Sequence, residues 1–573
     1  MRTAVRSGRE LWTGLRGQVV RSRPMSEPRH ILVAVAWPYA TGSLHLGHIA
    51  GAYLPPDIFA RYHRMAGNKV LMVSGSDVHG TPITVKADEE GVSPQEIVDR
   101  YHPRFLDYWD QLGIKFDLFT TTGTDNHKRV AQEFFLKLLE NGYLYRKTTS
   151  QFYDEEAQRF LPDRYVEGIC PHCGYIEARG DQCDNCGRTL DPHELVDPRS
   201  TLSGTAPVER DTEHYYWKLS AFQEPLLDWL RSRRGWRPHV ANFAIGMAKG
   251  GLHDRAFTRD LDWGIPIPID DLGPGKSIYV WWEAVMGYFS APQEWAQLQG
   301  IPEAWKEWWT NPEAESYYFI GKDNIPFHAV YWPALLMGHG GLNLPTNVPG
   351  NQYVTFGGSK ASKSRGVGRS LDWYLERFEP DALRYAVASV LPEHNDTDLS
   401  DAEIVRRINE ELVATWGNLV NRVLSMTARS EGGTIPELGT LDSDDHALLA
   451  GVDAALAQAG TQIEAVELRA ALRTVMDGGQ EVNAYLNQKA PWKTAATDPE
   501  RTATTLYVAL SAINGLKTGF SPFLPFTSAQ VHTMLGQKGT LEEGGWRRAE
   551  LQAGTPLPRP KPLFAKLELA ELE

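Results

Sequence analysis

Apolar residues in this chain follow two different periodicities, and the change between them predicts the first structural elements. Residues 31–36 read ILVAVA, a continuous apolar run rich in β-branched side chains, which is typical of a buried parallel strand. Pro38 and Gly42 then interrupt the strand pattern. From Leu46 the apolar positions take helical spacing, at Ile49, Tyr53, Ile58 and Phe59. A strand, a short turn and a helix form half of a nucleotide-binding unit, so we expect a Rossmann-like, doubly wound α/β domain with a parallel sheet.

In the last third of the chain the strand patterns give way to helical ones. After about Leu399 one apolar stripe runs through Ile408, Leu412, Trp416, Leu419 and Val423. A second long pattern, which ends before Pro491, runs through Ile463, Val466, Leu472, Val475 and Tyr485. These patterns predict a C-terminal α-helical bundle.

Length and composition indicate a multidomain globular protein. The 573 residues exceed what one hydrophobic core usually holds, and the 42% apolar and 23% charged residues are ordinary values. No apolar run approaches the ~18–20 residues of a membrane helix. The net charge of −14 does not favour general binding to nucleic acid. Any contact with RNA must therefore depend on local patches.

All 4 cysteines of the chain lie in one short stretch. Cys170, Cys173, Cys183 and Cys186 form two C-x2-C pairs, and four thiolates fill a tetrahedral zinc shell. A full shell predicts one structural Zn2+ per chain rather than a catalytic one. Two local disulfides, or a redox pair, are the alternative.

The first 25 residues have a composition of their own. They carry Arg2, Arg6, Arg9, Arg16, Arg21 and Arg23 against the single acidic residue Glu10. Such a segment resembles an organellar transit peptide. A disordered tail, or a true start at Met25, is the interpretation we favour, because the fold signal begins abruptly at His30.

Two histidines stand where the predicted strand passes into the predicted helix. His45 and His48 are three residues apart, so they share one face at the helix start. Free backbone N–H groups and the helix dipole attract anions at such an end. Gly47 between them leaves room for a flat base to approach the backbone. We therefore predict a phosphate-binding corner.

A second candidate for phosphate chemistry is the segment VTFGGSKASKSRGVGRS, residues 354–370. Its glycines make the segment mobile, and Lys360 and Lys363 are three residues apart. Two ammonium groups on a flexible loop are suited to closing on a triphosphate and stabilising the charge that builds up during attack. A solvated basic turn is the alternative.

Together these two segments resemble the class I aminoacyl-tRNA synthetases. His45-Leu46-Gly47-His48 matches the first signature of that family, and Lys360 to Ser364 matches the second, with Ala361 where Met is usual. The resemblance implies that His45, His48, Lys360 and Lys363 are catalytic and that Lys363 is the main phosphate contact. It also implies an ATP site that is formed by His45, Gly47, His48, Gly321, Asp323, Val354 and Lys363.

Several further stretches resemble the methionyl-tRNA synthetase family in particular. They are AWPYATGSLHLGH, GSDVHGTP, FLPDRYVEGICPHCG, YVWWEAVMGY, FIGKDNIPFH and NQKAPW. The resemblance implies a methionine pocket that is formed by Trp37, Tyr39, Asp77, Trp281, Ala284, Tyr288 and His328. An aromatic, apolar pocket suits the soft, uncharged methionine side chain. Asp77, which follows the apolar run 70–73 at a predicted strand end, would pair with the substrate ammonium.

The chain departs from the family pattern beside this pocket. Relatives of one bacterial type usually have Leu at Trp37, Pro at Val285 and Ile at Asn324. The details of side-chain contact are therefore not transferred from the family.

The resemblance implies a two-step reaction. Methionine first attacks the ATP α-phosphate to give methionyl-adenylate and pyrophosphate, and the tRNA 3′ end then takes the methionyl group. Mg2+ would accompany ATP. The partners are L-methionine, ATP and tRNA(Met), both initiator and elongator. Asn418, Arg422 and Trp492 match the positions that read the CAU anticodon, by stacking and hydrogen bonds.

The expected domain order follows from these motifs. Residues 1–25 form an extension and 26–141 the first half of the catalytic domain; 142–258 form a connective insert with the zinc knuckle. Residues 259–356 form the second catalytic half, 357–398 the lysine loop with a stem-contact region, and 399–573 the anticodon-binding bundle. We expect a cytoplasmic monomer, with no membrane contact.

Two other functions fit parts of the sequence. A synthetase for leucine or valine usually carries a much larger insertion, which this length disfavours. A zinc-ribbon tRNA-binding module without catalysis would not need both phosphate signatures.

Overall fold

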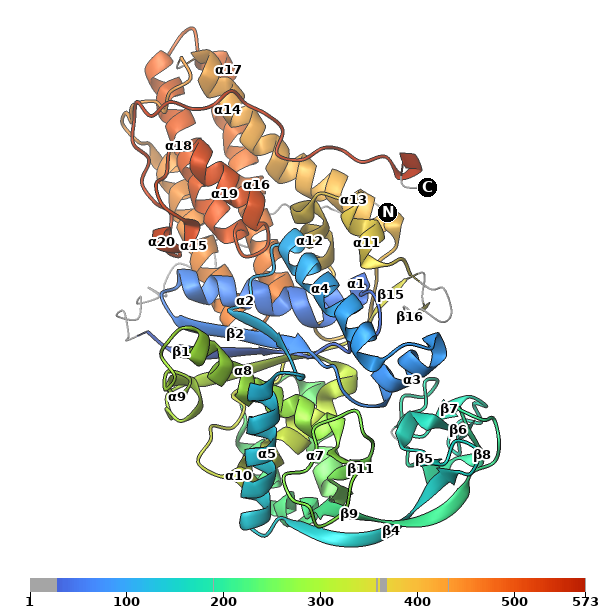
Figure 1. The fold of residues 1–573 in the computed structure, drawn as a ribbon. Coiled ribbons are helices and arrows are strands. Elements are labelled where there is room, and N and C mark those ends of the chain that lie inside the picture. Colours follow the sequence, from blue (N-terminus) through green and yellow to red (C-terminus); the bar gives the residue numbers. More distant parts are fainter. Residues whose placement is uncertain (1–27, 189, 357–358, 361–367, 431, 572–573) are drawn as a thin grey trace, which may run out of the picture.

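The computed structural model describes residues 28–571 except for 189, 357–358, 361–367 and 431. A parallel sheet lies at the centre of the molecule, a helical bundle stands at one end of it, and a small zinc-type knuckle projects from the other (Figure 1). Lys363 and Ala361 lie outside the described residues. So does the N-terminal extension through residue 27.

The central sheet has the predicted doubly wound topology. Its strands are β1 (His30–Val35), β2 (Lys69–Ser76), β3 (Leu118–Thr121), β13 (Glu315–Gly321) and β14 (Gly350–Asn351). They lie in the order β14-β13-β1-β2-β3, and every pairing is parallel. From β1 the chain first builds outward through β2 and β3, and it later returns to the other side of β1 with β13. The two directions meet between β1 and β13, where open α/β sheets bind ligands.

Helices cover both faces of this sheet. They are α1 (Leu46–His48), η3 (Ile49–Tyr53), α2 (Leu54–Met65), α3 (Thr81–Glu90), α4 (Pro94–Leu112), α5 (Asp125–Glu140), α8 (Val280–Leu298), η8 (Phe327–Tyr331) and α10 (Trp332–His339). Figure 1 shows α2 above the sheet and α5 and α8 below it. The strand residues 31–35 are fully buried between these layers, as the uninterrupted apolar run predicts.

A long antiparallel ribbon carries the cysteine-containing segment away from the sheet (Figure 1). Its strands are β4 (Leu144–Asp154) and β9 (Val208–Trp217), with β10 (Arg255–Ala256) beside β9. The knuckle contains β5 (Arg159–Phe160), β6 (Val166–Ile169), β7 (Ala178–Arg179) and β8 (Val196–Ser200). Its buried apolar side chains form a small cluster, separate from the main core, that includes Cys170 and Cys183.

Short elements lead from the ribbon back to the sheet and onward to the bundle. These are α6 (Gln223–Ser232), α7 (Pro238–Lys249), β11 (Thr258–Asp260), β12 (Lys276–Ile278), α9 (Lys306–Trp309), β15 (Val354–Phe356), β16 (Ser359–Lys360), α11 (Leu371–Leu375), α12 (Pro380–Ala388) and β17 (Thr397–Asp398).

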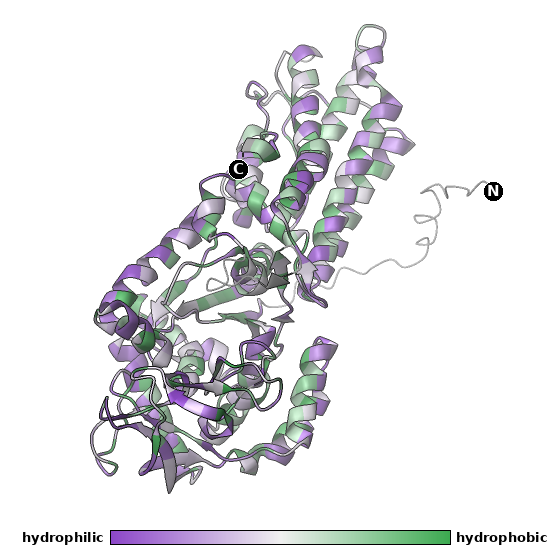
Figure 2. Ribbon diagram, turned by 90° about the vertical axis from the view of Figure 1, so that its right-hand side faces the viewer, coloured by the Kyte–Doolittle hydropathy of each residue, from purple (hydrophilic) through white to green (hydrophobic). Residues whose placement is uncertain are grey.

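The C-terminal part is an α-helical bundle, as predicted. Its elements are α13 (Asp401–Arg407), η9 (Ile408–Gly417), α14 (Asn418–Ser430), α15 (Ser443–Glu464), α16 (Leu468–Lys489), α17 (Pro491–Thr494), α18 (Pro499–Phe520), α19 (Pro525–Met534) and α20 (Leu541–Gly544). In Figure 2, apolar and polar colours alternate along these helices, as expected when each helix turns one apolar face inward. None of the described helices is long and apolar enough to cross a membrane.

The second long apolar pattern does not form one continuous helix. It crosses from the end of α15 to the start of α16, and the turn between them places Val466 at a φ of 58°. Distant groups hold this turn: Arg237 donates to the Val466 carbonyl at 3.2 Å, and the Glu393 carboxylate accepts from the Leu468 N–H at 2.7 Å.

A buried arginine joins the sheet domain to the bundle. Arg384 on α12 is paired with Asp57 on α2 at 2.7 Å, and both side chains are fully buried. Arg384 also donates to three backbone carbonyls, those of Leu112, Pro522 and Phe523, at 2.8–3.0 Å. The guanidinium therefore ties together the helix that follows the histidine signature, the end of α4 and the loop before α19.

Candidate active site

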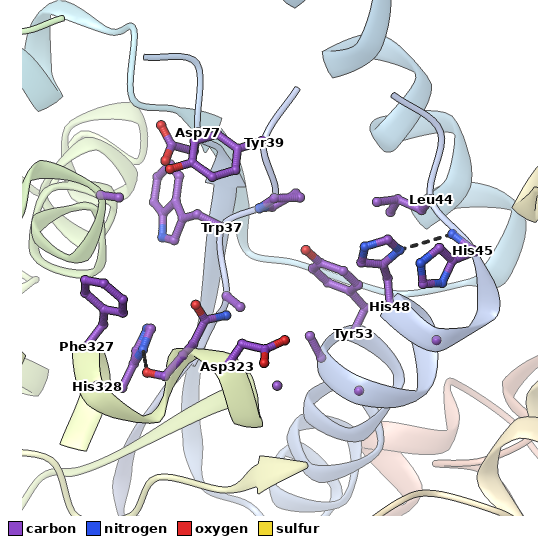
Figure 3. A pocket seen from close by; sticks show the side chains of 18 of the residues that line it. Trp37, Tyr39, Leu44, His45, His48, Tyr53, Asp77, Asp323, Phe327 and His328 are labelled. Carbon is purple, nitrogen blue, oxygen red and sulfur yellow. Dashed lines mark hydrogen bonds between the residues drawn. The ribbon is translucent and has the colours of Figure 1, made fainter. Parts of the chain in front are cut away.

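A cavity of about 430 Å³ lies at the carboxyl ends of β1, β2 and β13. Its walls come from the loops after these strands and from α8, η8 and β15. All seven side chains predicted for the methionine pocket line it: Trp37, Tyr39, Asp77, Trp281, Ala284, Tyr288 and His328. Six of the seven residues predicted for ATP also line it: His45, Gly47, His48, Gly321, Asp323 and Val354. Figure 3 shows Asp77, Tyr39 and Trp37 at one end of the cavity and His45 and His48 at the other.

The two histidines at the helix start are held in one arrangement. The backbone N–H of His45 donates to Nδ1 of His48 at 3.2 Å, and the two imidazole rings lie 3.8 Å apart (Figure 3). Because Nδ1 of His48 accepts a hydrogen bond, the proton of the neutral ring is on Nε2. A Cβ at Gly47 would lie 2.9 Å from the His45 ring. Any side chain at this position would therefore displace His45.

At the other end, an indole fills space that two glycines leave open. A Cβ at Gly75 would overlap the Trp37 ring and lie 2.5 Å from the Thr120 carbonyl, and a Cβ at Gly287 would lie 2.6 Å from the same ring. The larger side chain at position 37, compared with the usual Leu, is thus accommodated by β2 and α8. The Trp37 indole N–H and the Tyr39 hydroxyl are buried, and neither has a hydrogen-bond partner in the described part of the chain.

A buried tyrosine–histidine pair forms the floor beside Trp37. The Tyr288 hydroxyl lies 2.7 Å from Nε2 of His328, and Nδ1 of His328 lies 2.9 Å from the Asn324 carbonyl. A carbonyl only accepts, so Nδ1 carries the proton and Nε2 accepts from Tyr288. Burial lowers the pKa of His328 to about 4. This histidine is therefore neutral and presents a fixed tautomer.

An aromatic wall encloses the middle of the cavity. Trp281 stacks on Phe327 with ring centres 4.4 Å apart, and Tyr39 meets the edge of Trp281 at 5.8 Å. Sequence reasoning missed Phe327, as well as Tyr53, Gln352 and Tyr353, which also line the cavity. Phe327 and Tyr353 are each next to a predicted site residue in the sequence. That position and their aromatic rings were the only local indication that they line the cavity.

Asp77 lies at the carboxyl end of β2, as predicted, and is 2% exposed. Its backbone pairs with Tyr39, so the two residues are fixed side by side. The carboxylate accepts from the His79 N–H at 3.3 Å and from the Thr122 hydroxyl at 3.5 Å. Burial, and then the nearby Glu283 carboxylate, raise the pKa of Asp77 well above its ordinary value. A cation at this point would favour the ionised form.

The lysine segment begins beside the histidine end of the cavity. Val354 lines the cavity from β15, and Lys360 belongs to β16, which pairs with β15 through Thr355. Nearby, the Tyr353 hydroxyl donates to Asp323, and the Lys322 ammonium pairs with Asp396 at 2.8 Å. The described strand β15 thus lies beside the histidine end of the cavity.

The four cysteines of the knuckle form a cluster. Their Sγ atoms all lie within 4.8 Å of one another; Cys170 and Cys186 are 3.9 Å apart, and Cys173 and Cys183 are 3.6 Å apart. A tetrahedron with Zn–S bonds of about 2.3 Å has sulfur–sulfur edges of about 3.8 Å. All four cysteines are free thiols, so the disulfide alternative is wrong. The cluster fits a structural zinc site.

Two of the three residues predicted to read the anticodon lie close together at the far end of the bundle. The Arg422 guanidinium lies 6.0 Å from the Trp492 ring and donates to the Asn483 amide oxygen at 3.1 Å. Trp492 is 49% exposed, an unusual value for so large an apolar ring. Asn418 is exposed one helical turn before Arg422 on α14.

Comparisons with known proteins agree with this geometry. A family model described as tRNA synthetases class I (M) matches residues 31–424, and one described as the anticodon binding domain of methionyl tRNA ligase matches residues 435–573. A methionine–tRNA ligase from Roseiflexus sp. (strain RS-1) is 50% identical over 575 residues, which cover 94% of this chain and 97% of that protein. One from Thermomicrobium roseum is also 50% identical and covers 95% of this chain and 98% of its own length.

A solved structure shares the fold over most of the chain. The structure of Mycobacterium tuberculosis methionyl-tRNA synthetase bound by methionyl-adenylate superposes with a TM-score of 0.78 at 26% identity, over 94% of this chain and 100% of that one. The sheet, the cavity and the matched family model define a class I tRNA synthetase. The chain belongs to the methionine–tRNA ligase family.

Proposed function

We propose that this cavity binds L-methionine and ATP side by side, joins them to methionyl-adenylate, and then passes the methionyl group to the 3′ end of tRNA(Met). The observation that carries the proposal is the polarity of the cavity. One end is aromatic and contains the buried carboxylate of Asp77, and the other is a helix start that bears His45 and His48. Substrates with an apolar side chain plus ammonium, and with a triphosphate, fit these ends in that order.

Each side chain has a distinct part in this proposal. Asp77 pairs with the ammonium group, and Trp37, Trp281 and Tyr288 enclose the thioether side chain, with His328 holding the Tyr288 hydroxyl. Catalysis then consists of positioning and charge stabilisation, because the methionine carboxylate is itself the nucleophile.

At the nucleotide end, the histidines of α1 contact the phosphates, and Lys360 and Lys363 close over them. Gly47 and Val354 border the base, while Gly321 and Asp323 border the ribose. Mg2+ would neutralise phosphate charge when bound with ATP.

The remaining sequence predictions complete the proposal. One Zn2+ occupies the four-cysteine cluster and has a structural role, because four thiolates leave no coordination position open for catalysis. Asn418, Arg422 and Trp492 read the anticodon of initiator and elongator tRNA(Met). The protein acts as a cytoplasmic monomer, with the domain boundaries stated above.

ATP–pyrophosphate exchange assayed with each amino acid tests the central claim, the activation of methionine. Exchange that depends on methionine supports this claim, and exchange driven equally by leucine or valine contradicts it.

Replacing Lys363 by alanine tests the lysine loop. We expect methionyl-adenylate formation to fall by about 10²–10³-fold, because a cation aimed at the developing phosphate charge is lost. The dissociation constant of methionine, measured without ATP, should change little. A matched control is Lys322→Ala, which removes a nearby lysine already paired with Asp396. Equal losses in methionine binding and adenylate formation would overturn the role of Lys363.

Replacing Trp492 by alanine tests the anticodon surface. We expect kcat/KM for tRNA(Met) to fall by about 10–100-fold, because a stacked base is worth about 1–3 kcal/mol. ATP–pyrophosphate exchange should be unchanged, since the cavity lies in another domain. Phe243→Ala is the matched control, because Phe243 is similarly exposed, at 46% against 49%, but lies on α7. An unaltered aminoacylation rate in the Trp492 variant would contradict the assignment.

A further inference from the structure

Two carboxylates are buried together behind the ammonium end of the cavity. Asp77 is 2% exposed, and Glu283, on α8, is 0% exposed. Two anions in a region of low dielectric repel each other, and one of them normally takes up a proton unless a cation lies between them. The substrate can supply one positive charge, its ammonium group. The protein must therefore balance the second carboxylate.

His79 occupies the position that such a balancing group requires. Its Nδ1 lies 3.0 Å from one oxygen of Glu283 and 3.2 Å from the other, and its own backbone N–H donates to Asp77. On the far side of Glu283, Nε2 of His127 lies 3.5 Å from the carboxylate, while Nδ1 of His127 faces the Ser290 hydroxyl at 2.8 Å. The glutamate is thus held between two imidazoles.

The other titratable groups around this pair do not replace His79. Tyr39 and Tyr288 face Asp77 from the β1–α1 loop and from α8, and burial raises the pKa of both phenols, so they stay uncharged. Beyond Tyr39 lies the Arg164–Asp181 pair of the knuckle, which is internally balanced at 2.8 Å.

On the side of β11, Arg259 and Glu283 line the same very small cavity. The guanidinium of Arg259 lies over the Tyr279 ring at 3.8 Å. Trp263, with its ring 6.0 Å from that of His79, adds no charge.

We propose that His79 is a positioning residue for methionine: as an imidazolium paired with Glu283, it neutralises the second buried carboxylate and leaves Asp77 ionised for the substrate ammonium. The proposal deepens the proposed function and depends on Asp77 being the ammonium partner.

The protonation preferences of the three groups agree with this arrangement. Burial alone lowers the pKa of His79, but the Glu283 carboxylate and its hydrogen bond outweigh burial, so the pKa is raised. Burial raises the pKa of Glu283, yet His79 and His127 outweigh burial and lower it. Both shifts favour the charged forms of the histidine and the glutamate, in agreement with their 3.0 Å contact. Burial and Glu283 raise the pKa of Asp77 and His79 lowers it, so removing the imidazolium would raise this pKa further.

The experiment compares His79→Gln in two backgrounds by steady-state ATP–pyrophosphate exchange. With Glu283 present, we expect His79→Gln to raise the methionine KM by at least about tenfold at neutral pH, the effect of one unit in the pKa of Asp77. With Glu283→Gln, the same substitution should raise KM by less than about threefold, since no second negative charge then raises the pKa of Asp77. KM for ATP should not change. Equal effects in both backgrounds would overturn the proposal.

A pH profile separates this role from a merely structural one. The acid limb of kcat/KM for methionine should move to higher pH in His79→Gln, because Asp77 then binds a proton more readily. In Glu283→Gln alone, the acid limb should move to lower pH, because the charge that raises the pKa of Asp77 is removed. This second test can still be carried out if the His79 variant does not fold. His102→Gln is the matched control: His102 contacts Ser76 at 2.8 Å, next to Asp77 in the chain, and should leave the limb in place. An unmoved limb in Glu283→Gln contradicts the proposal.

Asp77→Asn distinguishes the role of Asp77 from that of His79. If it leaves the methionine KM unchanged, Asp77 does not bind the ammonium group, and the proposed function fails in that assignment. If it raises KM while the two backgrounds give equal His79 effects, Asp77 keeps its role and only the role of His79 is wrong.

Discussion

Replacing Arg384 by alanine is expected to lower the free energy of unfolding by about 3–5 kcal/mol, the usual cost of removing one partner of a buried ion pair. A loss of this size is large for a single substitution, and the contacts of Arg384 explain it. Three buried carbonyls, of Leu112, Pro522 and Phe523, would lose their donor together with the carboxylate of Asp57. Urea unfolding followed by tryptophan fluorescence measures the change.

The same variant should depend less on acid pH in its stability. Burial raises the pKa of Asp57, but Arg61 and Arg384 outweigh burial, so the pKa is lowered in the folded protein. Such a carboxylate contributes stability above its unfolded pKa, and the contribution is lost as the pH falls through the folded value. Without Arg384 the folded pKa rises toward the unfolded one, so this contribution is smaller and the free energy of unfolding falls less steeply as the pH is lowered. Urea unfolding at several pH values should therefore show the difference between the variant and the unchanged protein narrowing toward acid pH.

Two further variants serve as controls for Arg384. Arg377→Ala breaks a surface pair whose side chains are 35% and 70% exposed, and it should cost less than about 1 kcal/mol. Adding Asp57→Asn to Arg384→Ala should recover part of the loss, because the buried charge that has lost one of its two arginine partners is then absent. If Arg384→Ala cost no more than Arg377→Ala, the buried junction would not be a major source of stability.

Replacing Cys183 by serine is expected to abolish zinc binding and unfold the knuckle. A structural zinc ion contributes about 10–16 kcal/mol in small zinc domains, and the knuckle has only a small apolar cluster beside the metal ligands. The rest of the chain should stay folded, because its core is a separate cluster. Metal analysis should show zinc falling from one per chain toward zero, and limited proteolysis should cut between β4 and β9.

The knuckle also contacts the catalytic domain, so activity should fall with zinc content. The Tyr165 hydroxyl donates to Asp88 of α3 at 2.7 Å, and Arg159 pairs with the same carboxylate at 3.2 Å. Helix α3 follows directly from the Asp77 loop. His172→Gln is the matched control, because His172 stands inside the first cysteine pair without belonging to the cluster. Retention of zinc and a protected knuckle in the Cys183 variant would contradict the prediction.

Local patterns were sufficient to predict the elements that position the cavity. The apolar run of β1 and the change to helical spacing at Leu46 are properties of neighbouring residues. Asp77 stands at a strand end, where ligands bind, but it was chosen as a site residue because GSDVHGTP resembles the family. The structure confirms the parallel sheet and the helical bundle.

Features that depend on distant contacts could not be predicted. The turn at Val466 contains neither glycine nor proline, and it is held by Arg237 and Glu393, which are far away in the sequence. The fit of Trp37 against Gly75 and Gly287 is similar, because no periodicity relates position 37 to position 287. Phe327 was missed for the same reason: its role is defined by stacking on Trp281 across the cavity.

The space around Trp37 also constrains the order in which this pocket can change during evolution. The three atoms nearest to a methyl group at position 287 all belong to the indole, whereas one at position 75 also meets the backbone of β3. Gly75 is therefore fixed by the sheet whatever residue occupies position 37. At position 287 the closest contacts come from Trp37, so a lineage can gain a side chain at 287 only after the indole has been replaced by something smaller. As long as Trp37 is present, it prevents the substitution of Gly287.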